Sequence, residues 1–125
     1  FELGTTYRLL QQRDSKFLMA AKKEIGTNTT YIISTNAKSI CDSDNKYRGK
    51  VSSNFLRKEW IIYDDGFNPA KVRELSECRQ QLGYVNYEMK MLSGLSRSLR
   101  VVIPALDENL SPRPFRPLES RNELK

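Results

Sequence analysis

The chain has 125 residues, of which 38% are hydrophobic and 29% charged, a composition typical of one globular domain with a modest core. It contains no histidine, which excludes histidine-based triads, histidine acid–base catalysis and histidine metal sites. It also has no Gly-rich phosphate loop and no apolar run close to the roughly 18–20 residues of a membrane-spanning helix. We therefore expect a protein that is not an enzyme and that has no cofactor, no metal and no transmembrane segment.

Basic residues outnumber acidic ones, 21 to 15, which gives a net charge of +6. This balance favours a polyanionic partner, which is nucleic acid, anionic lipid or an acidic protein, without choosing among them. The two cysteines, Cys41 and Cys78, lie in unrelated surroundings and match no zinc pattern. Two reduced thiols in the cytosol or nucleus are the expectation. The chain starts at Phe1 with no basic-then-apolar leader, so no signal peptide is expected.

The first half of the chain predicts four short strands. Turn residues and runs of β-branched, aromatic and other apolar side chains place these strands at residues 7–10, 17–21, 29–35 and 49–54. The second and third strands form a hairpin with Lys22 and Lys23 at its root. Residues 36–47 are dense in Asn, Ser and Asp and predict a surface loop. In the fourth strand, Lys50 faces the side opposite Val51.

The second half predicts three more strands, at residues 60–63, 84–91 and 99–103. The first of them ends at a turn formed by residues 64–66. Residues 69–79 follow an Asn-Pro start and place apolar side chains at every third position, which allows a short helix. Residues 107–125 contain three prolines and few apolar side chains, and so they predict an extended, irregular tail. Seven strands at these spacings are typical of an antiparallel sandwich or barrel.

Several stretches, taken in order, carry the motifs of a known family. They are residues 17–20 followed by lysines, 31–34 (YIIS), 47–54 (YRGKVSSN), 63–69 (YDDGFNP), 79–82 with Val85, Tyr87, Glu88 and Leu92, residues 102–104 and Arg116-Pro117. Together they resemble the tubby C-terminal domain, whose patterns include GKLRSN, YDNGxNP, LRQELAAVxYExNxLG and VIVPG. Ala105 departs from the last of these patterns, where the family has glycine.

The resemblance implies a mainly all-β fold, an antiparallel tubby-type β-barrel wound around a central hydrophobic helix. Residues 1–106 match the N-terminal portion of that domain, and residues 107–125 form a Pro-containing tail that leads to the missing second half. Without the C-terminal strands and the central helix, strand edges and one core face are uncovered. We expect a second segment, another chain or a partner to complete the barrel. Residues 69–79 are mostly loop in the family, which is preferred to the short helix.

The resemblance also implies that the chain binds phosphatidylinositol bisphosphate. A bisphosphorylated inositol ring carries several negative charges in a small volume, so it needs two or three converging cations plus neutral donors. Ser52 occupies the position at which the family has an arginine. Arg57 and Lys58 could substitute for that arginine if their loop folds back. The lysines at the hairpin root could instead only solvate the hairpin end. The expected phosphoinositide-binding residues are Lys22, Lys23, Lys50, Arg57 and Lys58.

The expected function is that of a membrane-tethered adaptor at the plasma membrane or cilium, or in the nucleus, with a protein cargo or partner. Phe55 and Leu56, an apolar pair beside Arg57 and Lys58, could dip into a membrane interface while the cations hold headgroups. Besides a scramblase-like relative of the fold, which the sequence does not separate from the adaptor, two alternatives stay open. One is a nucleic-acid-binding or transcription-linked module, which is disfavoured because no recognition helix or stacking platform is visible. The other is a protein-interaction scaffold in which the open barrel edge pairs with a partner strand.

Overall fold

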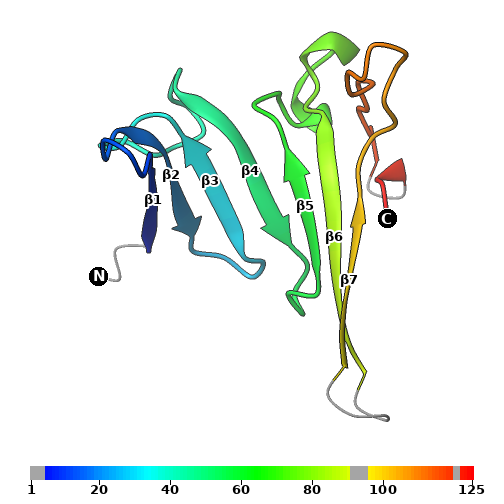
Figure 1. Ribbon diagram of the computed structural model, residues 1–125. Coiled ribbons are helices and arrows are strands. Elements are labelled where there is room, and N and C mark those ends of the chain that lie inside the picture. The colour runs from blue at the N-terminus through cyan, green and yellow to red at the C-terminus, as the bar shows by residue number, and fades with distance from the viewer. Residues whose placement is uncertain (1–4, 91–95, 120–121) are drawn as a thin grey trace.

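A computed structural model describes residues 5–90, 96–119 and 122–125. They form one antiparallel sheet in which each strand pairs with the next along the chain, in the order β1 to β7 (Figure 1). The strands are β1 (Thr6–Leu10), β2 (Phe17–Glu24), β3 (Thr30–Ser34), β4 (Tyr47–Ser53), β5 (Glu59–Tyr63), β6 (Gln81–Lys90) and β7 (Ser96–Val102). All seven predicted strands are present; Met91, the predicted end of the sixth strand, and Leu92 of the motif lie outside the described residues.

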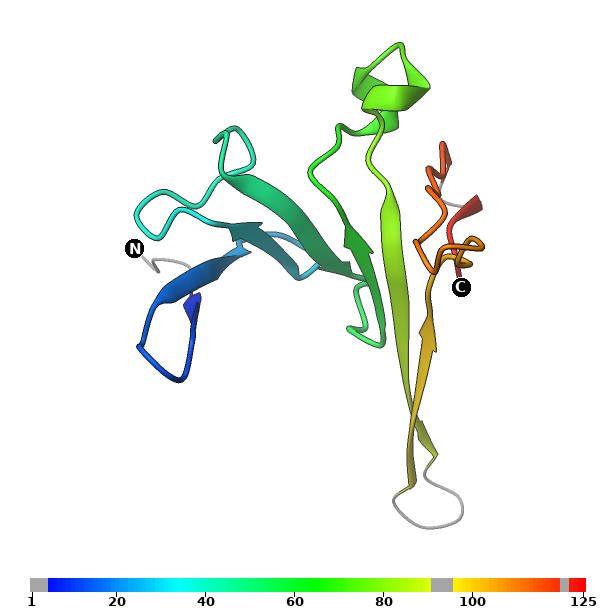
Figure 2. The same cartoon turned by 45° about the horizontal axis from the view of Figure 1, so that its top comes forward.

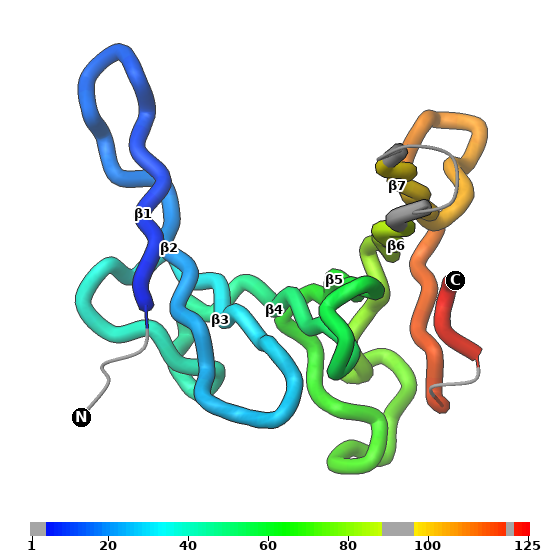
Figure 3. Tube along the Cα trace, turned by 90° about the horizontal axis from the view of Figure 1, so that it is seen from below, coloured from blue at the N-terminus to red at the C-terminus, as the bar shows by residue number. Residues whose placement is uncertain are grey.

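The sheet is curved and does not close. Viewed along its strands in Figure 3, it forms an open trough with β1 on one rim and β7 on the other. The predicted all-β class and the incomplete barrel are therefore confirmed. Because the two edge strands each pair on one side only within the described sheet, they keep unpaired backbone groups along their outer edges.

Alternation of side chains divides the sheet into two chemically different faces. Tyr7, Tyr31 and Trp60 share one face, with ring centroids 5.9 Å apart for the first pair and 6.1 Å for the second. Strands two apart are separated by roughly 9.6 Å, so these rings lean toward one another and mark the concave side. The concave face is apolar, and several of its side chains are more than half exposed: Tyr7, Leu9, Tyr87, Leu99 and Val101.

The opposite, convex face is polar along its middle. The register of β2 to β6 aligns one residue from each strand in a single row across this face: Lys22, Ile32, Lys50, Tyr63 and Gln81. Three members of this row are 5% exposed or less, namely Ile32, Tyr63 and Gln81. Burial on the convex face therefore depends on the segments that pack over it, and one of these is the tail.

Residues 115, 116 and 124 of the tail are hydrogen bonded to β6 and to the residue Cys78 before it. The side-chain amide of Gln81 donates to the carbonyl of Leu124 at 3.1 Å and accepts from its backbone N–H at 2.8 Å. Arg116 donates to the carbonyl of Cys78 at 3.0 Å, and the backbone N–H of Gln81 donates to Phe115 at 2.8 Å. Figure 2 shows the chain after β7 returning alongside β6 and β7.

The segment between β5 and β6 contains no α-helix. It holds two single turns of 3-10 helix, η1 (Pro69–Lys71) and η2 (Leu75–Glu77), and the first is capped by Asn68, which accepts from the N–H of Ala70 at 3.1 Å. The loop expected from the family resemblance is confirmed, and the short helix is wrong because Val72 is extended between the two turns. None of the described residues forms a helix with the length and apolarity needed to cross a bilayer.

Gly49 lies in β4 with φ of +141°, and a Cβ at this position would lie 2.2 Å from the carbonyl oxygen of Tyr63. Gly49→Ala should therefore lower the free energy of unfolding by at least about 2 kcal/mol, as measured by urea denaturation. Gly26→Ala is the control, since the nearest atom to its added Cβ is the carbonyl oxygen of Asn28 at 3.7 Å. Equal stability of the two variants would contradict the close approach of β4 and β5.

Candidate anion-binding site

A pocket of about 320 Å³ opens on the convex face beside Tyr63. Side chains of β4 and β5 line it, Arg79 enters from the residues before β6, and the tail brings Glu123 to the same pocket. Lys50, Ser52 and Ser53 are the members of β4 that line it. Asn28 of the hairpin between β2 and β3 also lines it, so the pocket combines four segments that are distant in the sequence.

Two cations meet at the ring of Tyr63. The guanidinium carbon of Arg79 lies 4.0 Å from the ring centroid, and the ammonium nitrogen of Lys50 lies 6.0 Å from it. Burial and, next, the charge of Arg79 lower the pKa of Lys50 from its ordinary value. Neither cation forms an ion pair with a carboxylate among the residues that the structure describes. A bound anion would offset the repulsion between them, which makes this pocket suited to an anionic group.

The turn after β5 holds Arg79 in place. The carboxylate of Asp64 accepts from the backbone N–H groups of Gly66 at 3.0 Å and Gln80 at 2.7 Å. The backbone N–H of Arg79 donates to the carbonyl of Phe67 at 2.8 Å. A Cβ on Gly66 would lie 2.4 Å from the Cα of Arg79, so the turn packs directly against this residue. The YDDGFNP motif thus positions a cation of the pocket.

A hydroxyl group, that of Ser52, occupies the position at which the resemblance implied an arginine. The hydroxyls of Ser52 and Thr30 are hydrogen bonded to each other at 3.0 Å across β3 and β4. Ser52 lines the pocket, and a hydroxyl is able to donate to a phosphate oxygen without adding charge. At this position the pocket therefore has a neutral hydrogen-bonding group and not a charge.

Two carboxylates also line the pocket, and both are engaged. Tyr63 donates its hydroxyl proton to Glu123, and burial together with this carboxylate raises the pKa of Tyr63. Glu59 accepts from the side-chain amide of Asn54 at 3.1 Å and from the hydroxyl of Tyr84 at 3.0 Å. Glu123 is therefore the acid that is held beside the ring on which the two cations meet.

The structure separates the predicted site residues into three places. Lys22 and Lys50 share the convex face, two strands apart with Ile32 between them. Lys23 pairs with Tyr31 and so lies on the concave face, although it follows Lys22 directly in the sequence. Only Lys50 of the five predicted residues lines the pocket.

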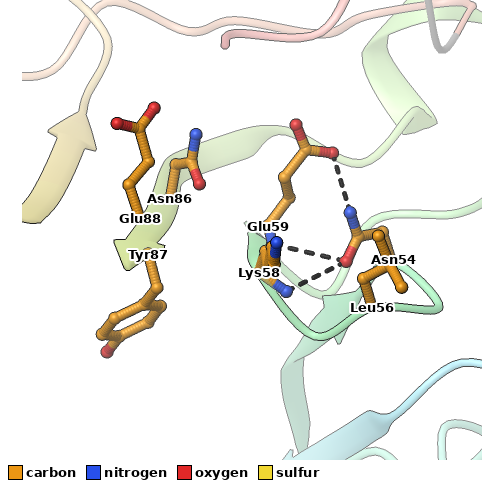
Figure 4. A pocket seen from close by; sticks show the side chains of 7 residues that line it. All are labelled: Asn54, Leu56, Lys58, Glu59, Asn86, Tyr87 and Glu88. Carbon is orange, nitrogen blue, oxygen red and sulfur yellow. Dashed lines mark hydrogen bonds between the residues drawn. The ribbon is translucent and has the colours of Figure 1, made fainter. Parts of the chain in front are cut away.

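Arg57 and Lys58 lie in the hairpin between β4 and β5. Lys58 lines a second pocket, of about 440 Å³, which shares Asn54 and Glu59 with the first (Figure 4). The side-chain oxygen of Asn54 accepts from the backbone N–H groups of Lys58 at 3.1 Å and Glu59 at 3.4 Å, which fixes the hairpin. Because Glu59 and Glu88 line this second pocket with one lysine, it is less suited to an anion.

Sequence reasoning did not select Arg79, Tyr63 or Glu123 as site residues. Arg79 is the first residue of one of the matched family motifs, and this match is the signal from which it could have been predicted as a site residue. Glu123 gave no signal, because its partner Tyr63 is 60 positions earlier in the chain.

Known proteins match the chain along most of its length. The family model described as the Tub family matches residues 1–125. Tubby-related protein 3 of Mus musculus is 33% identical over 127 residues, covering 96% of this chain and 28% of that protein. Tubby protein homolog 1 of Caenorhabditis elegans is 31% identical over 120 residues, covering 90% of this chain and 28% of that protein.

A shorter match has higher identity. Tubby-like F-box protein 12 of Oryza sativa subsp. japonica is 48% identical over 52 residues, which cover 41% of this chain and 12% of that protein. The chain spans 28% of the length of the mouse and nematode relatives. The family model nevertheless matches the chain from end to end, so the chain belongs to the Tub family.

Proposed function

We propose that this chain is a phosphoinositide-binding module that holds a bisphosphorylated inositol headgroup at an anionic membrane face. The observation that carries the proposal is the meeting of Lys50 and Arg79 at one tyrosine ring, with no ion-pair partner in the described part of the chain. Two cations held close together are matched by a ligand that presents more than one phosphate. No catalytic step is part of the proposal, and the module acts by binding.

The chemistry of the pocket fits such a headgroup. Arginine is able to hold a phosphate through two parallel hydrogen bonds, and lysine acts as a compact point charge. Ser52 and Asn28 line the same pocket and supply neutral groups that can donate to further oxygens. Lys22 adds a cation on the same face, roughly 9.6 Å from Lys50 along the row of paired residues.

Membership of the Tub family supports a role like that of tubby-related proteins. Because the chain spans 28% of the mouse and nematode relatives, the activity of the whole protein is a further proposal. We propose a membrane-tethered adaptor with a protein cargo, acting at the cytoplasmic face of the plasma membrane or cilium.

Lys50→Gln and Arg79→Gln should each weaken binding of inositol trisphosphate, a water-soluble headgroup analogue, about tenfold. Each variant removes a charge-assisted hydrogen bond, which contributes about 1.5 kcal/mol or more. Isothermal titration calorimetry measures the change, and unchanged affinity in both variants would exclude this pocket as the binding site.

The matched control uses neighbouring lysines on opposite faces. Lys22→Gln should weaken binding about threefold through its contribution to the potential of the convex face, whereas Lys23→Gln should leave affinity unchanged. Both variants lower the net charge equally, so the comparison separates a directional site from a nonspecific charge effect. Equal losses in the two variants would indicate that only net charge matters.

Glu123→Gln should strengthen binding of inositol trisphosphate by roughly three- to tenfold, because the variant removes a negative charge that competes with the ligand. The amide can still accept the hydrogen bond from Tyr63. Glu88→Gln makes the same charge change outside the pocket and should have little effect. Weaker binding by Glu123→Gln would show instead that the carboxylate supports the pocket.

A further inference from the structure

Two hairpins project apolar side chains from the same end of the sheet. Ile25, just after β2, is 85% exposed, and Phe55 and Leu56, just after β4, are 76% and 65% exposed. The backbone N–H of Ser53 donates to Thr29 at 2.8 Å, so the roots of the two hairpins are bonded to each other. Figure 1 shows both hairpins at one end and the 3-10 turns at the other.

The second hairpin is fixed by its own hydrogen bonds. The backbone N–H of Arg57 donates to Asn54 at 3.0 Å, and the N–H of Asn54 donates to Glu59 at 3.0 Å. The indole of Trp60 donates to the carbonyl of Arg57 at 3.1 Å. The exposed Phe55 and Leu56 are therefore held outward by an ordered turn, where their contact with water is unfavourable.

Cations flank the apolar side chains. Arg57 and Lys58 belong to the same hairpin as Phe55 and Leu56 and are exposed. An apolar tip bordered by exposed cations is complementary to an anionic bilayer, whose interior accepts the apolar groups while its headgroups meet the charges. A protein partner would need a groove shaped to this narrow tip, and three apolar side chains alone are far from a standard interface of about 1,600 Å².

We propose that these two hairpins form a membrane-insertion edge. Ile25, Phe55 and Leu56 enter the interface of an anionic bilayer, and Arg57 and Lys58 contact its headgroups. This orientation of the chain on the membrane rests on the proposed function, because it turns the pocket of Lys50 toward the same leaflet. Insertion of the hairpins itself needs no bisphosphorylated lipid. The site thus acts through two signals, a headgroup pocket and an apolar edge, which together give stable attachment where one alone is weak.

The single tryptophan provides the readout. Trp60 lies at the root of the inserting hairpin, bonded to Arg57, so brominated lipids should quench its fluorescence on binding to vesicles of phosphatidylcholine and phosphatidylserine. Vesicles of phosphatidylcholine alone should quench it weakly. Phe55→Ser with Leu56→Ser should reduce partition into the anionic vesicles at least tenfold and leave binding of inositol trisphosphate unchanged.

The matched control places the same substitutions at the other end of the sheet. Phe67 and Leu75 are 61% and 57% exposed there, and Phe67→Ser with Leu75→Ser should bind the anionic vesicles like the unmodified protein. Equal binding by both double variants, with Trp60 unquenched, would overturn the insertion edge. If Phe55→Ser with Leu56→Ser binds the anionic vesicles normally but no longer binds a protein that the unmodified chain binds, the insertion edge is also wrong. The hairpins would then be a docking site for that protein.

The two proposals fail in different ways. If inositol trisphosphate does not bind the unmodified protein while Phe55 and Leu56 still control vesicle binding, the headgroup pocket is wrong and the insertion edge stands. If inositol trisphosphate binds and depends on Lys50, but the hairpin variants bind vesicles normally, only the insertion edge is wrong.

Discussion

The contacts of Tyr63 are the interaction on which the convex face depends. Its ring carries Arg79 at 4.0 Å, its hydroxyl bonds to Glu123, and its carbonyl oxygen fills the space that a Cβ on Gly49 would need. Each contact ties a different segment to β5: the residues before β6, the tail and β4. The ring, the hydroxyl and the backbone carbonyl of Tyr63 therefore bring these segments together beside the pocket. A change that loosens Tyr63 would disturb the fold and the site together.

The two faces of the sheet carry different side chains and have different roles. The concave face carries apolar side chains that lean toward one another, as the spacing between the rings of Tyr31 and Trp60 shows. The convex face carries the cations and the hydroxyl of Ser52, which the tail and the turn before β6 organise into a pocket. Because neighbouring residues of a strand point to opposite faces, one short segment serves both tasks. β2 is the clearest case, since Lys22 and Lys23 lie on different faces.

Most of the fold could be predicted from sequence because strand formation leaves local signals. Runs such as residues 29–35 and 60–63 carry β-branched and aromatic side chains between turn residues, and the strands lie there. The site was predicted only in part. Lys50 lies in the pocket, but Arg79 and Glu123 reach it through turn and tail contacts that no local pattern records. Lys22 and Lys23 were predicted to share a site because they are adjacent in the sequence. They lie on opposite faces because side chains alternate along a strand.

The lowered pKa of Lys50 couples ligand binding to protons. A phosphate placed beside this ammonium would favour its charged form and raise its pKa again. The complex would then take up a fraction of a proton wherever the solution pH lies between the pKa of the free site and that of the occupied one. Through this lysine, affinity would fall as the pH rises through that interval. The arrangement that gathers positive charge at one ring thus also makes the occupancy of the site responsive to alkalinity.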